Sequence, residues 1–196
     1  MLGAPGKPEG HARTPRQIRT AARVMTCGKV KQRPGKAREC GVTTRTVENH
    51  VNVPAAASDV WDRAVNPDGI NFEMRPWMTM SMPPGAAGLS VEDIPLGQPV
   101  GRAWLRLFGL IPFDFDRLTI VELESGRRFL ERSTMLSMRC WEHERTLTPV
   151  AGGTRVHDRV TFRPRLPIPG LAALLERVVD AFFRHRHRRL QEYFGK

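Results

Sequence analysis

Residues 140–162 have the sequence CWEHERTLTPVAGGTRVHDRVTF, which predicts a β-hairpin. The interpretation of the whole chain depends on which side chains lie on each face of this hairpin. Before and after the glycine pair, mainly apolar positions alternate with polar ones, as they do in a hairpin that buries one face. The buried face is predicted to carry Trp141, His143, Arg145, Leu147, Val156, Asp158, Val160 and Phe162. A histidine, an arginine and an aspartate therefore share a face that is otherwise apolar.

Two registers of this hairpin are open. If residues 150–153 form the loop, Arg145 lies opposite Asp158; if the glycine pair alone makes the turn, the two charges are diagonal neighbours. Cross-strand partners lie about 5 Å apart and diagonal ones about 7–8 Å, so the long arginine side chain reaches the aspartate in both registers. A turn just before the hairpin would bring Glu131 of the preceding strand close to His143.

The chain from residue 43 onward predicts a strand, two short helices, about six antiparallel strands and one long helix. The segment TRTVENHVNV alternates like a strand and ends at Pro54, and NPDG breaks the helical stretch that follows. The last helix begins near Pro169 and has apolar residues at helical spacing. These residues are Leu171, Leu174, Leu175, Val178 and Phe182. Because strands follow one another and helices are segregated from them, the predicted fold class is α+β.

Residues 1–42 differ from the rest in composition, with ten Lys/Arg, two Asp/Glu and no Phe, Trp or Tyr. So few apolar side chains cannot offset the entropy lost on ordering, and this basic leader is predicted to be disordered. Residues 43–196 then form the single folded domain. Two other interpretations are open: the leader contacts nucleic acid or another anionic surface, or it is not native and Val42 is a misread start codon.

Cysteine usage and hydropathy indicate the cellular compartment of the protein. The three cysteines, Cys27, Cys40 and Cys140, lack zinc-like spacing and leave one thiol over in any disulfide scheme, which favours cytosolic thiols. No run approaches the roughly 18 apolar residues of a membrane span, and the N-terminus lacks the apolar segment of a secretion signal. We therefore predict a soluble, cytoplasmic protein without a transmembrane segment.

Three segments together resemble a known family. Residues 47–71, VENHVNVPAAASDVWDRAVNPDGIN, resemble the opening of the START/polyketide-cyclase superfamily (SRPBCC), residues 129–162 resemble its paired late strands, and residues 170–190 resemble its closing helix. This resemblance covers residues 43–196 and implies a helix-grip fold, in which a curved antiparallel sheet of about seven strands wraps around the C-terminal helix. It also implies a cavity between sheet and helix, which bacterial and other relatives use for lipids, sterols, polyketides or plant hormones.

The polar residues of the predicted inner face have two interpretations. They can be structural pairs, Glu131 with His143 and Arg145 with Asp158, because an unpaired buried charge costs several kcal/mol. They can also form the polar end of a ligand cavity. In that case Arg145 would hold a carboxylate or carbonyl oxygen, and His143 would move a proton. The two interpretations overlap, since a paired residue can also face a ligand.

The methionine-rich stretch MRPWMTMSM, residues 74–82, is either ordinary core or a cavity wall that adapts to apolar ligands. In the second interpretation its side chains join those of the sheet and the last helix around the ligand. The full set of predicted ligand-binding residues is Trp77, Met78, Met80, Phe129, Glu131, Trp141, His143, Arg145, Asp158, Val160, Phe162, Val178 and Phe182.

The basic stretch RHRHRR, residues 184–189, predicts a solvated helix end whose charges complement the helix dipole. His185 and His187 are two residues apart and so face different sides, which argues against a metal site. The sequence contains no glycine-rich phosphate loop, HExxH or GxSxG motif. Catalysis would therefore depend on the shape of the cavity, with His143 and Arg145 as the best candidates.

The leading prediction is a protein that binds a hydrophobic or amphipathic small molecule, such as a lipid or polyketide-like compound, between sheet and helix. No metal or cofactor is predicted, and nucleic acid is not an expected partner. The first alternative is a cyclase- or dehydratase-like enzyme that uses His143 and Arg145. The second is an interaction module that contacts nucleic acid or an anionic partner through its basic segments. A monomer and a homodimer fit the sequence equally well.

Overall fold

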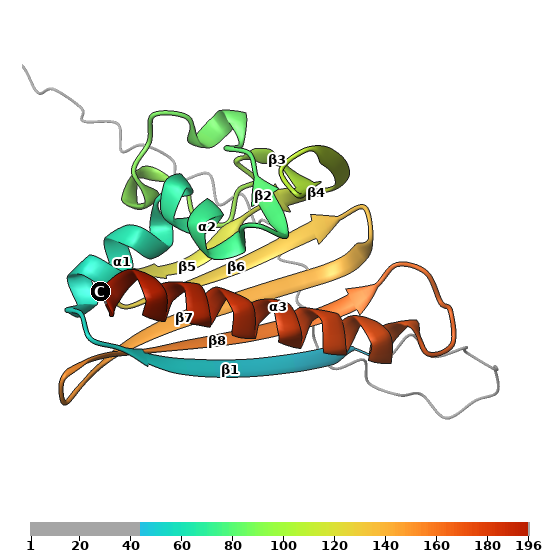
Figure 1. Cartoon of the computed structure of the whole chain (residues 1–196). Coiled ribbons are helices and arrows are strands. Elements are labelled where there is room, and N and C mark those ends of the chain that lie inside the picture. The colour runs from blue at the N-terminus through green and yellow to red at the C-terminus, as the bar shows by residue number, and fades with distance from the viewer. Residues whose placement is uncertain (1–43, 196) are drawn as a thin grey trace, which may run out of the picture.

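A computed structural model describes residues 44–195 and shows one curved antiparallel sheet wrapped around a long C-terminal helix (Figure 1). The strands are β1 (Arg45–Val53), β2 (Met78–Met80), β3 (Gly101–Leu107), β4 (Ile111–Leu118), β5 (Ile120–Glu124), β6 (Arg128–Met135), β7 (Met138–Val150) and β8 (Gly153–Pro164). The helices are α1 (Ala57–Val65), α2 (Pro67–Met74) and α3 (Leu171–Phe194), with short 3-10 helices η1 (Pro84–Ala86) and η2 (Val91–Asp93). The predicted helix-grip fold is confirmed, with eight strands instead of about seven. The predicted leader, residues 1–42, lies outside the described residues.

The sheet has the strand order β1-β8-β7-β6-β4-β3-β2, with β5 paired to β6, so the first strand lies beside the last one. Val150 and Gly153 are the last paired residues of the β7–β8 hairpin, and Arg145 lies directly opposite Asp158. The first of the two predicted registers is therefore confirmed. The turn requires glycine at Gly153, because a Cβ atom there would lie 2.0 Å from the carbonyl oxygen of Val53 in β1.

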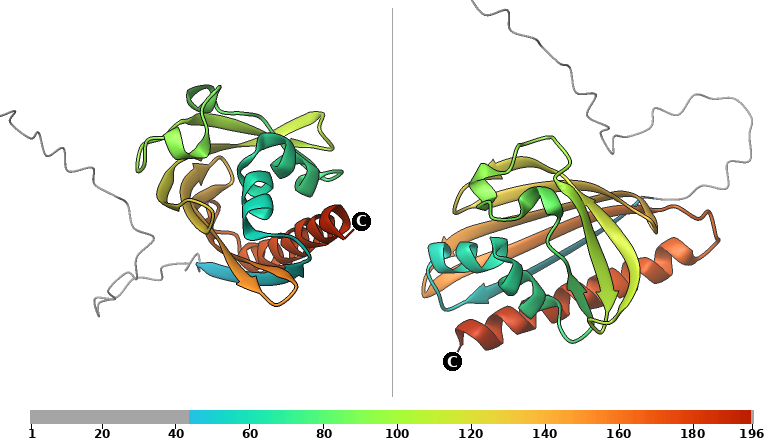
Figure 2. Two further views of the ribbon diagram at one scale, coloured as in Figure 1. Left: turned by 90° about the vertical axis from the view of Figure 1, so that its left-hand side faces the viewer. Right: turned by 90° about the horizontal axis from the view of Figure 1, so that it is seen from above.

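Helices α1 and α2, both predicted, lie between the β2 edge of the sheet and α3 (Figure 2). The side chain of Asn66 accepts a hydrogen bond from the backbone N–H of Asp68 and so caps the start of α2. Gly69 lets the two helices approach closely, because a Cβ atom there would lie 1.9 Å from the carbonyl oxygen of Arg63 in α1. The predicted NPDG break is thus the point where one helix gives way to the next.

Hydrogen bonds of the Asn71 side chain link α2 to β2. Its amide nitrogen donates to the carbonyl oxygens of Pro67 and Met80 at 3.0 Å each, and its oxygen accepts a hydrogen bond from the N–H of Met80 at 2.8 Å. Strand β2 in turn pairs with β3. These bonds fix the position of α2, and of Glu73 within it, relative to the sheet.

Helix α3 has 24 residues and lies along the concave side of the sheet, as predicted. Its buried residues are Val179, Phe183, Arg186, His187 and Leu190. The predicted position of Val178 in the ligand-binding interior is wrong, because Val178 is 54% exposed whereas Val179 is 8% exposed. The spacing of apolar residues alone shifted the predicted buried face of the helix by about one residue, because two of the residues on the actual buried face are polar.

Apolar side chains pack between sheet and helix in two clusters. The first cluster comprises Val47, Met74, Leu105, Met135, Met138, Val160, Phe162, Val179 and Phe183. The second comprises Val51, Val53, Val60, Trp61, Leu147, Val156 and Leu190. Along β8, Asp158 lies between Val156 of the second cluster and Val160 of the first. The polar residues of the inner face therefore separate two apolar regions of the interior.

Candidate functional site

Arg145 is the centre of a buried polar network and binds two carboxylates at once. Its Nε and Nη2 atoms donate to Oδ1 and Oδ2 of Asp158, each at 2.8 Å. Its Nη1 and Nη2 atoms donate to Oε1 and Oε2 of Glu73 at 2.9 and 3.0 Å. These bonds use every guanidinium N–H group but one, and the side chain is 1% exposed.

Two histidines complete the hydrogen bonding of Asp158. The Nε2 atom of His143 in β7 lies 2.9 Å from Oδ1, and the Nε2 atom of His187 in α3 lies 2.7 Å from Oδ2. Because an ionised carboxylate only accepts hydrogen bonds, both histidines carry a proton on Nε2. The rings of Phe129 and Phe183 stand edge-on to His143, with centroids 5.3 and 5.1 Å away, and hold the imidazole in place.

Glu73 joins α2 and α3 to the same network. Besides Arg145, its buried carboxylate accepts a hydrogen bond from Nε of Arg186 at 3.0 Å, and Nη2 of Arg186 lies 2.8 Å from the same oxygen. The network therefore connects α2, β7, β8 and α3 across the interior. We call its members the Arg145 network; they are Glu73, His143, Arg145, Asp158, Arg186 and His187.

The charges of the Arg145 network balance. Burial alone would raise the pKa of Asp158 and of Glu73, but Arg145, together with Arg186 at Glu73, holds both pKa values below the usual carboxyl range. Two carboxylates thus face two guanidinium groups, and their charges cancel when both histidines are neutral. Buried ions persist when they are paired and hydrogen-bonded in this way. The geometry supports the interpretation of Arg145 and Asp158 as a structural pair.

Three members of this network, Glu73, Arg186 and His187, were not predicted from the sequence. The predicted solvated helix end at residues 184–189 is wrong for Arg186 and His187, which are 7% and 5% exposed. They are buried because the carboxylates of Glu73 and Asp158 face this turn of α3. The one available signal was an acidic residue inside the short apolar segment of α2, and that signal alone does not identify a partner.

Glu131 belongs to a second polar group, which also contains Asp116 of β4 and Ser133 of β6. The hydroxyl of Ser133 donates to Oε1 of Glu131 at 2.8 Å. Glu131 pairs with His143 across the strands, as predicted, but its Oε2 atom lies 4.0 Å from Nδ1 of the imidazole. That distance is too long for a hydrogen bond, so the hydrogen-bonded partner of His143 is Asp158. We call Asp116, Glu131 and Ser133 the Asp116 group.

The apolar members of the predicted ligand-binding set lie in more than one place. Met78, Met80, Trp141, Val160, Phe162 and Phe182 lie in the first apolar cluster or pack against it. Phe129 packs against the second cluster. Trp77 is 51% exposed and contacts Phe108 of the β3–β4 turn, with ring centroids 6.1 Å apart. The structure therefore brings together six of these apolar residues and separates Phe129, Trp77 and Val178 from them.

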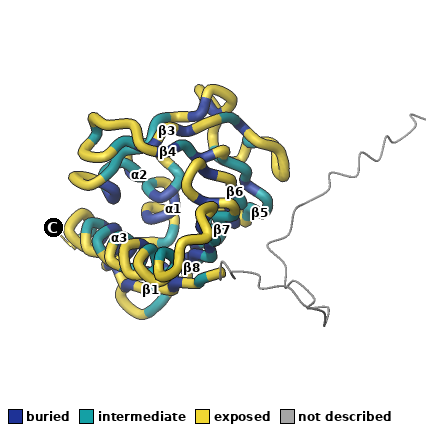
Figure 3. The backbone as a smooth tube through the Cα atoms, turned by 90° about the vertical axis from the view of Figure 1, so that its right-hand side faces the viewer, coloured by how far each residue is buried: buried dark blue, intermediate teal, exposed yellow. Residues whose placement is uncertain are grey.

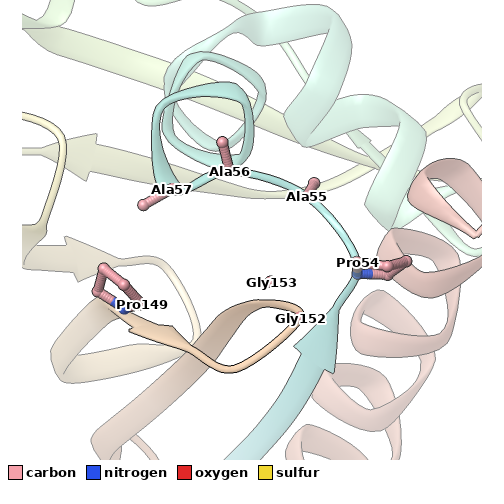
Figure 4. Close-up of a pocket in the computed structure, with 7 residues that line it drawn as sticks. All are labelled: Pro54, Ala55, Ala56, Ala57, Pro149, Gly152 and Gly153. Atoms are coloured by element: carbon pink, nitrogen blue, oxygen red, sulfur yellow. The ribbon is translucent and has the colours of Figure 1, made fainter.

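A surface hollow with a volume of about 490 Å³ lies between the β1–α1 connection and the β7–β8 turn (Figure 4). Its lining residues are Pro54, Ala55, Ala56, Ala57, Pro149, Gly152 and Gly153. They are small and carry no titratable group. We assign no function to this hollow.

The described part of the chain contains neither a group of residues placed to bind a metal ion nor a helix able to span a membrane. His185 and His187 face different sides of α3: Nε2 of His185 lies 2.8 Å from the carbonyl oxygen of Arg75, whereas His187 is bound to Asp158. Within residues 44–195, no three His, Cys, Asp or Glu side chains are placed to hold a metal ion. No helix in that range combines the length and the apolar character needed to span a membrane.

Several solved structures have a similar fold. A START superfamily protein from Mycobacterium smegmatis is 11% identical, with a TM-score of 0.58, and the match covers 76% of this chain and 97% of that one. The Zhui aromatase/cyclase from Streptomyces sp. R1128 is 17% identical, with a TM-score of 0.58 and coverage of 78% and 94%. Protein CV1439 from Chromobacterium violaceum is 14% identical, with a TM-score of 0.59 and coverage of 77% and 97%. No curated protein matches the chain.

These likenesses establish the class of protein: the chain has the START-like (SRPBCC) helix-grip fold that its sequence resembles. At such low identities they show the fold alone. Residues 51–194 also match the sequence model of a family described as "Domain of unknown function (DUF8410)". Because the match spans more than half of the chain, the protein belongs to that family.

Proposed function

We propose that this protein binds a hydrophobic or amphipathic small molecule between the sheet and the first half of α3. One observation carries the proposal: methionines converge in and around the first apolar cluster, at an end of the sheet that is surrounded by exposed apolar side chains. The methionines are Met74, Met78, Met80, Met135 and Met138. The Arg145 network would form the closed floor of this site.

Strand register brings several turns together at this end of the sheet. Asp116 of β4 pairs with Met135 of β6, and Met138 of β7 pairs with Pro164 of β8. The β3–β4 turn, the β6–β7 turn and the start of α3 therefore lie at the same end, which Figure 3 views directly. Its exposed apolar residues are Leu107, Phe108, Leu110, Ile111, Leu136, Leu166, Ile168, Leu174 and Val178. An exposed apolar surface of this extent is typical of a site where a ligand or partner binds.

The residues of the proposed site suit a wall that rearranges around its ligand. Methionine is unbranched and polarisable, so its side chain repacks at little cost. The Arg145 network is different, because breaking one of its buried ion pairs leaves an uncompensated charge. A ligand is therefore accommodated by movement of methionines against α3, with the charged floor unchanged.

The START-like fold, which this chain shares with an aromatase/cyclase, is compatible with both binding and catalysis. Binding has the stronger support, because Arg145 is already bound by Asp158 and Glu73 and the Nε2 atom of His143 is bound by Asp158. A cyclase- or dehydratase-like reaction would need a substrate to replace one of these bonds. We propose a binding protein consisting of one domain, residues 43–196, in keeping with the predicted cytoplasmic location.

The proposed site is tested by two matched substitutions of partly buried phenylalanines. Phe182→Ala removes a ring from the first cluster, and Phe129→Ala removes one from the second. We expect Phe182→Ala to weaken the binding of naphthalene, measured by equilibrium dialysis on the full chain, about fivefold, since a lost apolar contact of this size costs about 1 kcal/mol. Phe129→Ala should reduce the affinity less, because this ring packs against the second cluster and is connected to the proposed site through His143.

Native mass spectrometry of the purified full chain gives an independent check, because a co-purifying apolar molecule identifies the ligand class directly. Equal losses of naphthalene affinity in the two variants, or no binding by the unmodified chain, would contradict the proposed site.

A further inference from the structure

Asp116 is a buried carboxyl group that the Arg145 network does not include. It lies on the inner face of β4, where it pairs with Ala103 of β3 and Met135 of β6, and it is 4% exposed. Ala103 is fully buried, and Met135 belongs to the first apolar cluster. Asp116 is therefore the polar group that borders the proposed apolar site from the β4 side.

The surroundings of Asp116 oppose its ionisation. Burial, and then the negative charge of Glu131, hold the pKa of Asp116 well above its usual range, and Asp114 acts in the same direction. Ser133 is the one neighbour that favours the charged form, and its hydroxyl is also bound to Glu131. A nearby carboxyl group and burial both disfavour the charged form of a carboxylic acid. The folded protein therefore favours the protonated form of Asp116.

One oxygen of Asp116 lacks a donor. Its Oδ1 atom is buried and receives no hydrogen bond from any residue in the range 44–195. A buried polar atom left without a partner costs about 1–3 kcal/mol, so such atoms in folded proteins are commonly completed by a bound group. A ligand hydroxyl supplies what is missing, because it donates to a carboxyl oxygen and also accepts from a carboxylic acid.

Neither arginine of the Arg145 network is available for an anionic ligand. Arg145 and Arg186 are both committed to Glu73, and Arg145 also to Asp158. The Asp116 group places two carboxyl groups at this site, and the imidazole nitrogen of His143 lies 4.0 Å from Glu131. A further carboxylate from a ligand is a poor match for such surroundings.

We infer that the ligand is a neutral molecule with a hydroxyl group, which hydrogen-bonds to Asp116 while its apolar body packs among the methionines of the first cluster. This inference rests on the proposed function and specifies the ligand class. It also replaces the expectation that Arg145 holds a ligand carboxylate, because four of the five N–H groups of that guanidinium are bound to Asp158 and Glu73.

Three probes that share one ring system test the inference on the full chain at pH 7. Naphthalene has no polar group, 2-naphthol carries a neutral hydroxyl, and 2-naphthoate carries a carboxylate. We expect equilibrium dialysis to show 2-naphthol binding about tenfold more tightly than naphthalene, the gain of one buried hydrogen bond, and 2-naphthoate binding most weakly. Equal affinities for 2-naphthol and naphthalene, or a preference for 2-naphthoate, would overturn the inference while leaving apolar binding established.

Two variants locate the hydroxyl. Asp116→Ala should abolish the preference for 2-naphthol, measured as the ratio of the affinities of that variant for 2-naphthol and naphthalene. Asp116→Asn should keep the preference, because its amide retains a carbonyl oxygen. If Asp116→Ala binds 2-naphthol as tightly as the unmodified chain does, the hydroxyl lies elsewhere and the inference fails. If the unmodified chain binds none of the three probes, the proposed function itself fails.

Discussion

Arg145→Met is expected to lower the free energy of unfolding by about 3–5 kcal/mol at pH 7. Methionine fills much of the same volume but leaves Glu73 and Asp158 buried without the cation that both share. Arg186 and the two histidines remain, yet none of them reaches both carboxylates. Urea denaturation followed by tryptophan fluorescence measures the loss.

The effect of Arg145→Met should depend on pH in a defined direction. In the unmodified chain Glu73 and Asp158 have lowered pKa values. Their contribution to stability is therefore present above the ordinary carboxyl pKa of about 4 and is lost as the pH falls through the lowered values. The variant lacks this contribution at every pH. The difference in stability between the two proteins should be largest near neutrality and shrink in acid.

Arg128→Met is the matched control for Arg145→Met. Arg128 also binds two carboxylates, those of Glu122 and Glu144 at 2.7 and 2.6 Å, but it does so on the outer face, where its side chain is 22% exposed. Ion pairs in contact with water contribute about 1 kcal/mol or less. If Arg145→Met costs no more than this control, or if its cost does not change with pH, the Arg145 network is not the electrostatic centre of the fold.

The pattern of the sequence predicts the sheet well because strand geometry couples every second residue. Once Trp141 and Leu147 are assigned to the buried face, the residues between them at His143 and Arg145 follow without further information. The hairpin turn then fixes Arg145 opposite Asp158. Local alternation is sufficient to assign these residues to the inner face, whereas the choice between the two registers of the turn required the structure.

The rest of the network could not be predicted, because its partners come from helices. Glu73 and Arg186 are 113 residues apart, and no local pattern reports how α2 and α3 are placed across the sheet. The spacing of apolar residues in α3 is misleading for the same reason, since Arg186 and His187 occupy buried positions that apolar periodicity treats as exposed. Burial of a charged residue is decided by its partner, which is a property of the tertiary structure.

Asp116→Asn is expected to stabilise the protein by about 2 kcal/mol at pH 7, an outcome opposite in sign to most substitutions of buried residues. The pKa of Asp116 is raised, so the folded state favours the protonated carboxyl. The stability associated with Asp116 is full at pH values below its unfolded pKa of about 4 and declines as the pH rises toward the folded value. Asparagine has no proton to lose and its amide can donate to Glu131. The gain should therefore vanish near pH 3.5 and grow toward neutrality.

Asp114→Asn is the matched comparison, because Asp114 lies on the same face of β4, two residues away, and is also buried. Its carboxylate accepts hydrogen bonds from the backbone N–H groups of Phe115 and Leu136, both at 2.7 Å, and from the N–H and hydroxyl of Ser137. An amide replaces one of these acceptor oxygens with a donor, so Asp114→Asn should destabilise the protein. Opposite changes in the melting temperature at pH 7 are expected because the folded state favours the protonated form of Asp116, whereas the side chain of Asp114 accepts four hydrogen bonds. If both substitutions destabilise the protein, the folded state does not favour the protonated form of Asp116.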